Sequence, residues 1–187
     1  MNVERIKTPY DILEFLNENI TYGWLGTDRI IRKNSMKEFI YYYKTLAIDE
    51  ILKYKVRTCI EQVNLMKYLF DEIGIKSNMY CTRMYEDENF NDLDAPERMH
   101  CFLLYFIDDK VYQLEHPDPT RVGIHTYESE NQAIDFIVSI YENMMKEEYI
   151  KENKKAPAGG FKRTTTKFDV IPKGLSYKEF NLYINSL

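Results

Sequence analysis

The chain has 187 residues, of which 44% are hydrophobic and 29% charged, a balance typical of one globular domain. Acidic residues outnumber basic ones by 30 to 25 and the formal net charge is −5, so nucleic acid is not an expected partner. No apolar run reaches the roughly 18 residues that span a bilayer, and the N-terminus does not resemble a signal peptide. Three cysteines are too few for a disulfide scaffold, so we predict a cytoplasmic protein with free thiols and no membrane partner.

Helical patterns dominate the first third of the chain. Thr8-Pro9 precedes apolar residues at helical spacing up to Ile20, which predicts a capped amphipathic helix. Residues 22–26 contain two glycines and interrupt this pattern. Two further helical pieces are predicted around Phe39 and Ile51.

The next predicted helix has the clearest local signature. Thr58 and Glu61 have the capping-box spacing, with a hydroxyl at the N-cap and a carboxylate three residues later. An apolar stripe follows, and Gly74 stands where a helix commonly ends. If Thr58 is the N-cap, Cys59 occupies the first helical position.

After that helix the hydrophobic period changes to that of strands. Strands are predicted at 78–85, 99–107 and 111–115, the last two joined by a tight turn at Asp108-Asp109. Because the 99–107 stretch is apolar at odd and even positions, it is expected to be a central strand covered on both faces. Residues 86–98, rich in acidic side chains and Asn, are predicted to be a solvated loop.

The last third begins with an amphipathic helix predicted over 130–147. The basic segment 151–167 contains an Ala-Pro-Ala-Gly-Gly stretch and is predicted to be a mobile loop. A last strand is expected at 168–171 and a closing helix at 176–187. The layout is α+β, with helices flanking a mostly antiparallel sheet.

The domain organisation follows from these elements. No period of roughly 20–50 residues repeats, which excludes solenoids and propellers. We expect one domain, 1–187, with a helical N-terminal part at 1–55 and a core at 56–127. Its C-terminal part consists of the long helix, the mobile loop at 151–167 and a closing strand and helix at 168–187.

Three residues in chain order have the pattern of a nucleophilic site: Cys59 at a helix start, His100 on a strand and Glu115 on the next strand. A helix N-terminus lowers the pKa of a thiol, because unpaired N–H groups and the macrodipole favour the thiolate. An imidazole can take the thiol proton, and a carboxylate on the other ring nitrogen fixes the tautomer and stabilises the cation.

The hairpin geometry indicates which carboxylate can serve. With Asp108-Asp109 as a two-residue turn, Glu115 lies diagonal to His100 on the same sheet face, roughly 7–8 Å away and within reach of side chains. His116 is then expected to point to the opposite face. A turn longer by one residue reverses this parity, so Asp118 stays open as the alternative acid.

Three stretches together resemble the core of transglutaminase-like proteins: Arg57 to Gln62, Met99 to Phe102 and Lys110 to Glu115. That superfamily is papain-like and uses a Cys, a His and an Asp in this order, on a helix and two neighbouring strands. This sequence departs from the pattern at Thr58, where many members have glycine, and at Glu115, where most have aspartate.

The resemblance implies a papain-like domain that transfers acyl groups through a thioester on Cys59, with His100 protonating the leaving group and with no cofactor or metal. It also implies an oxyanion hole made by the Cys59 backbone N–H and one side chain, for which Trp24 is the first candidate and Gln62 the second. We expect hydrolysis of an amide or isopeptide bond in a peptide or protein, as by a cysteine protease, deamidase or amidase, because water is the default acceptor.

Other interpretations stay open. Free cysteine is among the most buried residue types, so Cys59 could be a core thiol, as we expect for Cys81 and Cys101. The chain would then be a catalytically inactive papain-like module that binds a peptide or protein. A small-molecule acyltransferase would need a deep closed pocket, and a peptide or protein substrate an open groove. A metal site has the least support, because its spacing matches no standard zinc pattern. Its candidate ligands are Glu115, His116, Asp118 and His125.

Overall fold

The computed structural model describes residues 5–33, 36, 38–86 and 98–187. The fold is α+β, as predicted, with one antiparallel sheet of five strands in the order β8-β7-β6-β5-β9. The strands are β5 (Ser77–Tyr85), β6 (Arg98–Ile107), β7 (Lys110–Glu115), β8 (Gly123–Tyr127) and β9 (Lys162–Phe168). The helices are α1 (Pro9–Asn19), α2 (Phe39–Tyr42), α3 (Ile48–Tyr54), α4 (Cys59–Glu72), α5 (Glu130–Lys151) and α6 (Tyr177–Asn185).

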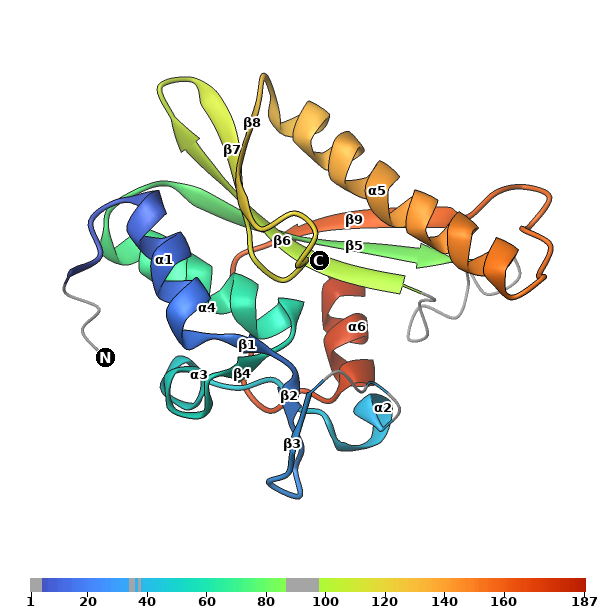
Figure 1. Cartoon of the computed structure of the whole chain (residues 1–187), viewed down its shortest axis with the longest axis horizontal. Coiled ribbons are helices and arrows are strands. Elements are labelled where there is room, and N and C mark those ends of the chain that lie inside the picture. Colours follow the sequence, from blue (N-terminus) through green and yellow to red (C-terminus); the bar gives the residue numbers. More distant parts are fainter. Residues whose placement is uncertain (1–4, 34–35, 37, 87–97) are drawn as a thin grey trace.

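Helices cover both faces of the sheet. In Figure 1, α5 lies across the upper face, and α1, α4 and α6 lie below the sheet. Side chains alternate between the two faces along each strand, so the apolar residues form two cores. Leu103 of β6 belongs to the lower core with α4, and Leu104 belongs to the upper core with α5.

The predicted hairpin is confirmed. β6 is the central strand, and both of its faces are buried over most of its length. Leu103 pairs with Leu114 and Ile107 with Lys110, which is the register of a two-residue turn. Asp108 and Asp109 both have positive φ, as the two central residues of a type I′ turn require.

Helix starts also agree with their sequence signals. The Thr8 hydroxyl caps α1, and the Ser176 hydroxyl caps α6. Predicted strands 78–85, 99–107 and 111–115 are each found within one residue of their bounds. The long helix predicted over 130–147 continues for another turn.

Two expectations for the C-terminal part are wrong. The segment 151–167 is not a loop throughout, because β9 runs from Lys162 to Phe168 and pairs with β5 along the edge of the sheet. Of the strand expected at 168–171, only Phe168 is in a strand, as the last residue of β9. Most of the loop predicted at 86–98 lies outside the described residues, and its last residue, Arg98, opens β6.

The interruption at 22–26 contains strands that the sequence pattern did not indicate. β1 (Thr21–Tyr22) pairs in parallel with β4 (Val56–Arg57), and β2 (Trp24–Leu25) pairs with β3 (Ile31–Arg32). Gly23 joins β1 to β2 with φ of 151°, and a Cβ there would lie 2.6 Å from the carbonyl oxygen of Arg32. Glycine is therefore required where the chain turns past the residues that precede α4.

No helix in the described ranges combines the length and the apolar character needed to cross a membrane.

Candidate active site

The start of α4 is fixed by the predicted capping box. Oγ1 of Thr58 accepts a hydrogen bond from the Ile60 backbone N–H at 3.2 Å, and Oε2 of Glu61 accepts from the Thr58 backbone N–H, also at 3.2 Å. Thr58 also donates its hydroxyl proton to Oε2 of Glu61 at 2.6 Å. Cys59 is thus the first residue of the helix, where N–H groups lack partners within the helix.

Buried polar groups behind the cap hold it in place. The Tyr43 hydroxyl donates to Oε1 of Glu61, a residue only 2% exposed. Burial raises the pKa of Glu61, although the bonds from Thr58 and Tyr43 oppose that effect. Arg57, fully buried, donates to the Glu50 carbonyl, and burial lowers its pKa to about 10. The helix start is therefore a rigid, internally bonded structure.

His100 and Glu115 are brought together as the hairpin register predicts. Nε2 of His100 lies 3.4 Å from Oε2 of Glu115, and the two side chains are 6% and 1% exposed. The His100 ring stacks on Tyr141 of α5, with 4.3 Å between ring centroids. Because Glu115 takes Nε2, Nδ1 is the ring nitrogen left for the thiol.

Glu115 is held by further bonds. Its Oε2 accepts from Nε2 of Gln113 at 2.6 Å, and its Oε1 accepts from the Asp118 backbone N–H at 3.0 Å. Gln113 in turn accepts from the Tyr127 hydroxyl and from Arg121. These hydrogen bonds hold the Glu115 carboxylate in one orientation, in which it faces His100.

The Cys59 sulfur contacts both His100 and Cys101. Hydrogen bonds from the Cys101 thiol are the largest cause that lowers the pKa of Cys59, and the His100 hydrogen bond and charge lower it further against the opposing effect of burial. Burial by itself would lower the pKa of His100, but the charges of Glu115 and Cys59 overcome it and raise that pKa to about 10. Both shifts favour a thiolate paired with an imidazolium.

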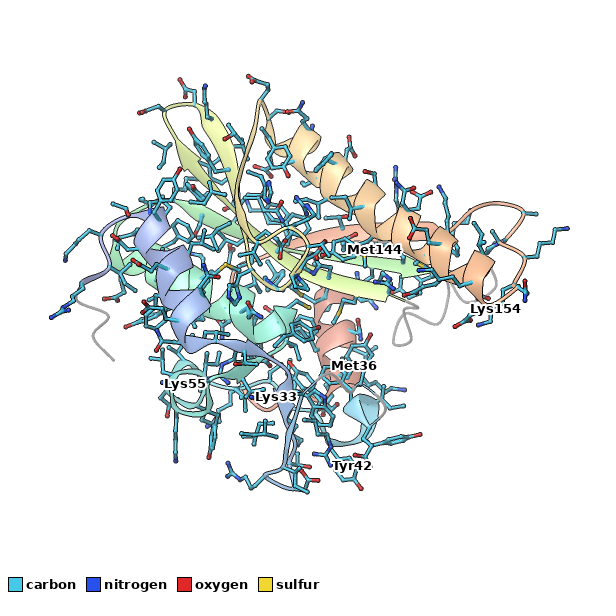
Figure 2. The ribbon with its side chains drawn as sticks, viewed as in Figure 1. Lys33, Met36, Tyr42, Lys55, Met144 and Lys154 are labelled. Carbon is cyan, nitrogen blue, oxygen red and sulfur yellow. The ribbon has the colours of Figure 1, made fainter. Side chains whose placement is uncertain are left out.

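Cys59 lies in the walls of two cavities. The larger, of about 600 Å³, also has His100 and Tyr141 in its wall; the smaller, of about 380 Å³, lies over the start of α4 and extends to α2. In the view of Figure 2, Met144 from the larger cavity lies by α5, and Met36 from the smaller lies lower, beside α2 and α6. Four residues belong to both walls: Tyr22, Cys59, Arg98 and Met99.

Gln62 is placed beside Cys59, one helical turn further along α4, and lines the larger cavity. Its Oε1 accepts from Nδ1 of His116 at 2.5 Å, and in the described part of the chain its buried Nε2 has no hydrogen-bond partner. An amide N–H₂ without a partner on the cavity wall can donate to an oxyanion.

His116 lies on the side that the hairpin parity predicts. It contacts Gln62 of α4, below the sheet, whereas His100, the partner of Glu115, stacks on Tyr141 of α5, above it. His116 also lines the larger cavity.

The side chains of the two other candidates are held by other contacts. Trp24 is buried against Phe39 and under Arg32, and it lines neither of the two cavities at Cys59. The Asp118 carboxylate accepts from the backbone and side chain of Thr120, so Glu115 rather than Asp118 faces His100. Gln62 is thus the oxyanion candidate that the structure brings to the sulfur.

Three residues around the sulfur were not singled out from the sequence. Tyr141 belongs to the apolar stripe of α5, where its spacing does not distinguish it from a core residue. Tyr22, although 39% exposed, lines both cavities, and desolvation together with the charge of Cys59 raises its pKa. Arg98 shares both walls and pairs with Glu148 of α5. No local sequence signal marks any of them.

The alternative metal ligands are occupied by other contacts. His125 contacts the Arg121 carbonyl at 2.7 Å through Nε2, and His116 contacts Gln62. Among the described residues no group of three or more His, Cys, Asp or Glu side chains is arranged to hold a metal ion.

Neither the models of known protein families nor the curated proteins include a match to this chain. The residues and their geometry are therefore the basis on which a function can be assigned.

Proposed function

We propose that the protein is a cysteine-dependent acyl-transfer enzyme with a papain-like, transglutaminase-like core, and that it hydrolyses an amide or isopeptide bond in a peptide or protein. One observation carries the proposal: the Cys59 sulfur lies at a helix N-terminus, in contact with a histidine that a buried carboxylate orients, on the wall of a cavity. These are the groups that thiol catalysis needs, within reach of one another.

The chemistry follows in two steps. The Cys59 thiolate attacks the substrate carbonyl carbon, and the oxyanion accepts hydrogen bonds from the Cys59 backbone N–H and from Nε2 of Gln62. The His100 imidazolium gives its proton to the leaving nitrogen as the C–N bond breaks, which leaves a thioester on Cys59. His100 then takes a proton from water, the water oxygen attacks the thioester, and the released thiolate restores the starting pair.

The two cavities support an extended substrate. Cys59 stands where a space of about 600 Å³ meets one of about 380 Å³, so a chain bound through both would present a bond in its middle to the sulfur. A small acyl donor needs only a single enclosed pocket. We therefore favour a peptide or protein over a small-molecule thioester as the substrate.

The test is product analysis in oxygen-18-labelled water with a library of peptide amides. Hydrolysis places one labelled oxygen in each new carboxyl group, and transfer to an amine places none. Cys59→Ala should abolish product formation, and Cys81→Ser, a matched change of a buried cysteine outside the cavities, should retain it.

Alkylation of Cys59 separates the enzyme from the inactive-module alternative. If the site is active, Cys59 should react with iodoacetamide faster than N-acetylcysteine does at about pH 6.5, two units below an ordinary thiol pKa. The alkylation rate should fall in His100→Ala. An absence of product from every peptide, together with Cys59 labelling no faster than N-acetylcysteine, would reject the enzyme in favour of a binding module.

A further inference from the structure

Three thiols form a row from the candidate active site into the core. Cys81 and Cys101 are directly opposed on β5 and β6. All three cysteines belong to the apolar cluster below the sheet, and the Cys101 side chain interacts with the sulfurs of both Cys59 and Cys81. A disulfide requires two such neighbouring sulfur atoms to approach to about 2 Å.

Access from solvent distinguishes these thiols. Cys59 is 7% exposed and lines both cavities, whereas Cys81 and Cys101 are 0% exposed and line neither of them. A small oxidant that enters the cavities therefore meets Cys59 first. Because thiolates are oxidised far faster than thiols, the helix N-terminus and His100 direct oxidation to the same sulfur.

We propose that Cys59 and Cys101 are a redox pair, in which hydrogen peroxide oxidises Cys59 and Cys101 then closes a reversible disulfide with it. In the first step the Cys59 thiolate attacks one peroxide oxygen, the O–O bond breaks, and Cys59 becomes a sulfenic acid as hydroxide leaves. In the second step the Cys101 sulfur attacks the Cys59 sulfur and the S–O bond breaks. Overall two thiols lose two electrons to one peroxide, which is reduced to two molecules of water.

The surroundings explain why Cys101 stays reduced until Cys59 reacts. Burial, together with the neighbouring sulfurs of Cys59 and Cys81, raises the pKa of Cys101 and keeps it protonated. A sulfenic acid on Cys59 is neutral, so the charge that opposes ionisation of Cys101 disappears at that moment. The Cys101 proton leaves with the hydroxide as water, and His100 lies beside the leaving oxygen as a second proton donor.

The disulfide has a chemical consequence for the candidate active site. Cys59 in a disulfide cannot attack a carbonyl, and it also cannot proceed to the irreversible sulfinic acid. Thiol reductants would restore the free sulfur. The pair thus gives the protein a reversible response to peroxide, whether or not the same sulfur also acts on a substrate.

The test is mass spectrometry of the reduced full-length protein after one equivalent of hydrogen peroxide, with unfolding and N-ethylmaleimide to block the remaining thiols. Wild type should carry one N-ethylmaleimide group out of a possible three, and proteolytic mapping should find a disulfide between Cys59 and Cys101. After a second equivalent of peroxide, Cys101→Ser should still have no disulfide on Cys59 and should accumulate the sulfinic acid of Cys59 about tenfold faster than wild type.

The matched control is Cys81→Ser, which should form the Cys59–Cys101 disulfide at the wild-type rate. A disulfide mapped only between Cys81 and Cys101, or sulfinic acid forming equally fast in wild type and Cys101→Ser, would overturn the proposal. The mapping in wild type decides the matter even if Cys101→Ser fails to fold. No substrate enters these measurements, so their failure and the failure of the proposed acyl transfer are separate results.

Discussion

At Cys59 and His100, each side chain shifts the pKa of the other in the direction that keeps the pair charged. The shifts define a window of pH in which the pair exists. Contacts with Cys101 and His100 lower the pKa of Cys59, so the thiolate persists below the ordinary thiol range. Opposed by burial but raised by Glu115 and Cys59, the pKa of His100 is about 10, so its cation persists well above neutral pH.

The first prediction concerns this window. The rate constant kcat/KM should fall on the alkaline side with a midpoint near 10, where His100 loses its proton, and on the acid side with a midpoint well below the ordinary pKa of a thiol. The contribution of His100 to stability has the same sense: it is complete below the ordinary histidine pKa of 6.5 and is lost as the pH rises through about 10. Steady-state kinetics over a range of pH measures the two midpoints, and circular dichroism verifies that the protein stays folded at each pH. An alkaline midpoint near 6.5 would contradict the pairing.

A second prediction concerns the amide of Gln62. If Nε2 donates to the oxyanion, Gln62→Ala should lower kcat about 100- to 1,000-fold and change KM little, because the bond forms in the transition state. Gln132→Ala is the matched control, since the Gln132 side chain is exposed and its one described hydrogen bond is accepted from the Glu128 backbone N–H. An increase in KM at constant kcat would instead assign Gln62 to substrate binding.

At the scale of the element, the N-terminus of α4 combines a stability role with a chemical one. Thr58→Ala removes the acceptor for the Ile60 N–H and the hydroxyl that bonds Glu61. We expect the free energy of unfolding to fall by about 1 kcal/mol and the alkylation rate of Cys59 to fall as the helix start loosens. Denaturant unfolding and iodoacetamide kinetics on the same samples measure both effects.

The chain contains a natural control for this change. Thr8 caps α1 through an equivalent box with Asp11, and neither residue lines the cavities at Cys59. Thr8→Ala should destabilise the protein without changing the reactivity of Cys59. If both variants slow alkylation equally, the effect comes from general loosening and not from the cap of α4.

What could be predicted at this scale depended on whether the signal was local. The caps at Thr8 and Thr58 and the turn at Asp108-Asp109 are encoded within a few residues, so these element ends were found. The strand from Lys162 to Phe168 was not, because most of its residues are polar or basic and are only half-buried or exposed. Its pairing with β5 joins residues that lie between 77 and 89 positions apart in the sequence, and an edge strand needs no apolar alternation to be stable.

The site followed the same rule. Cys59, His100 and Glu115 could be placed because a helix cap and a hairpin register position them. The pairing of His116 with Gln62 could not, because the hairpin parity gives the side of the sheet on which His116 lies but not the helix that covers that side. Tyr141 contacts His100 from a helix that follows in the sequence, and only the tertiary structure brings it there.

At the scale of the whole molecule, both ends of the chain contribute to one core. Ile12 of α1 and Phe180 of α6 are fully buried members of the same apolar cluster as α4. Phe180→Ala should lower the free energy of unfolding by about 3–5 kcal/mol, whereas Leu182→Ala, on the exposed side of α6, should change it by less than about 0.5 kcal/mol.

The measurement is denaturant unfolding followed by two probes, Trp24 fluorescence near the N-terminal strands and far-ultraviolet circular dichroism for the helices. Because the cluster is continuous, both probes should shift together in Phe180→Ala. A shift in circular dichroism alone would mean that α6 unfolds as a separate unit.

The two residues of the proposed catalytic pair, Cys59 and His100, belong to different layers of the molecule. Cys59 is anchored in the apolar layer beneath the sheet, and His100 stacks on the helix above it, so they meet only at the end of β6. A nascent or half-denatured chain with one layer assembled has the sulfur and the ring apart, and its thiol then has ordinary reactivity. If Cys59 is the proposed nucleophile, completion of folding is its activation step, and other proteins do not meet a reactive sulfur during synthesis.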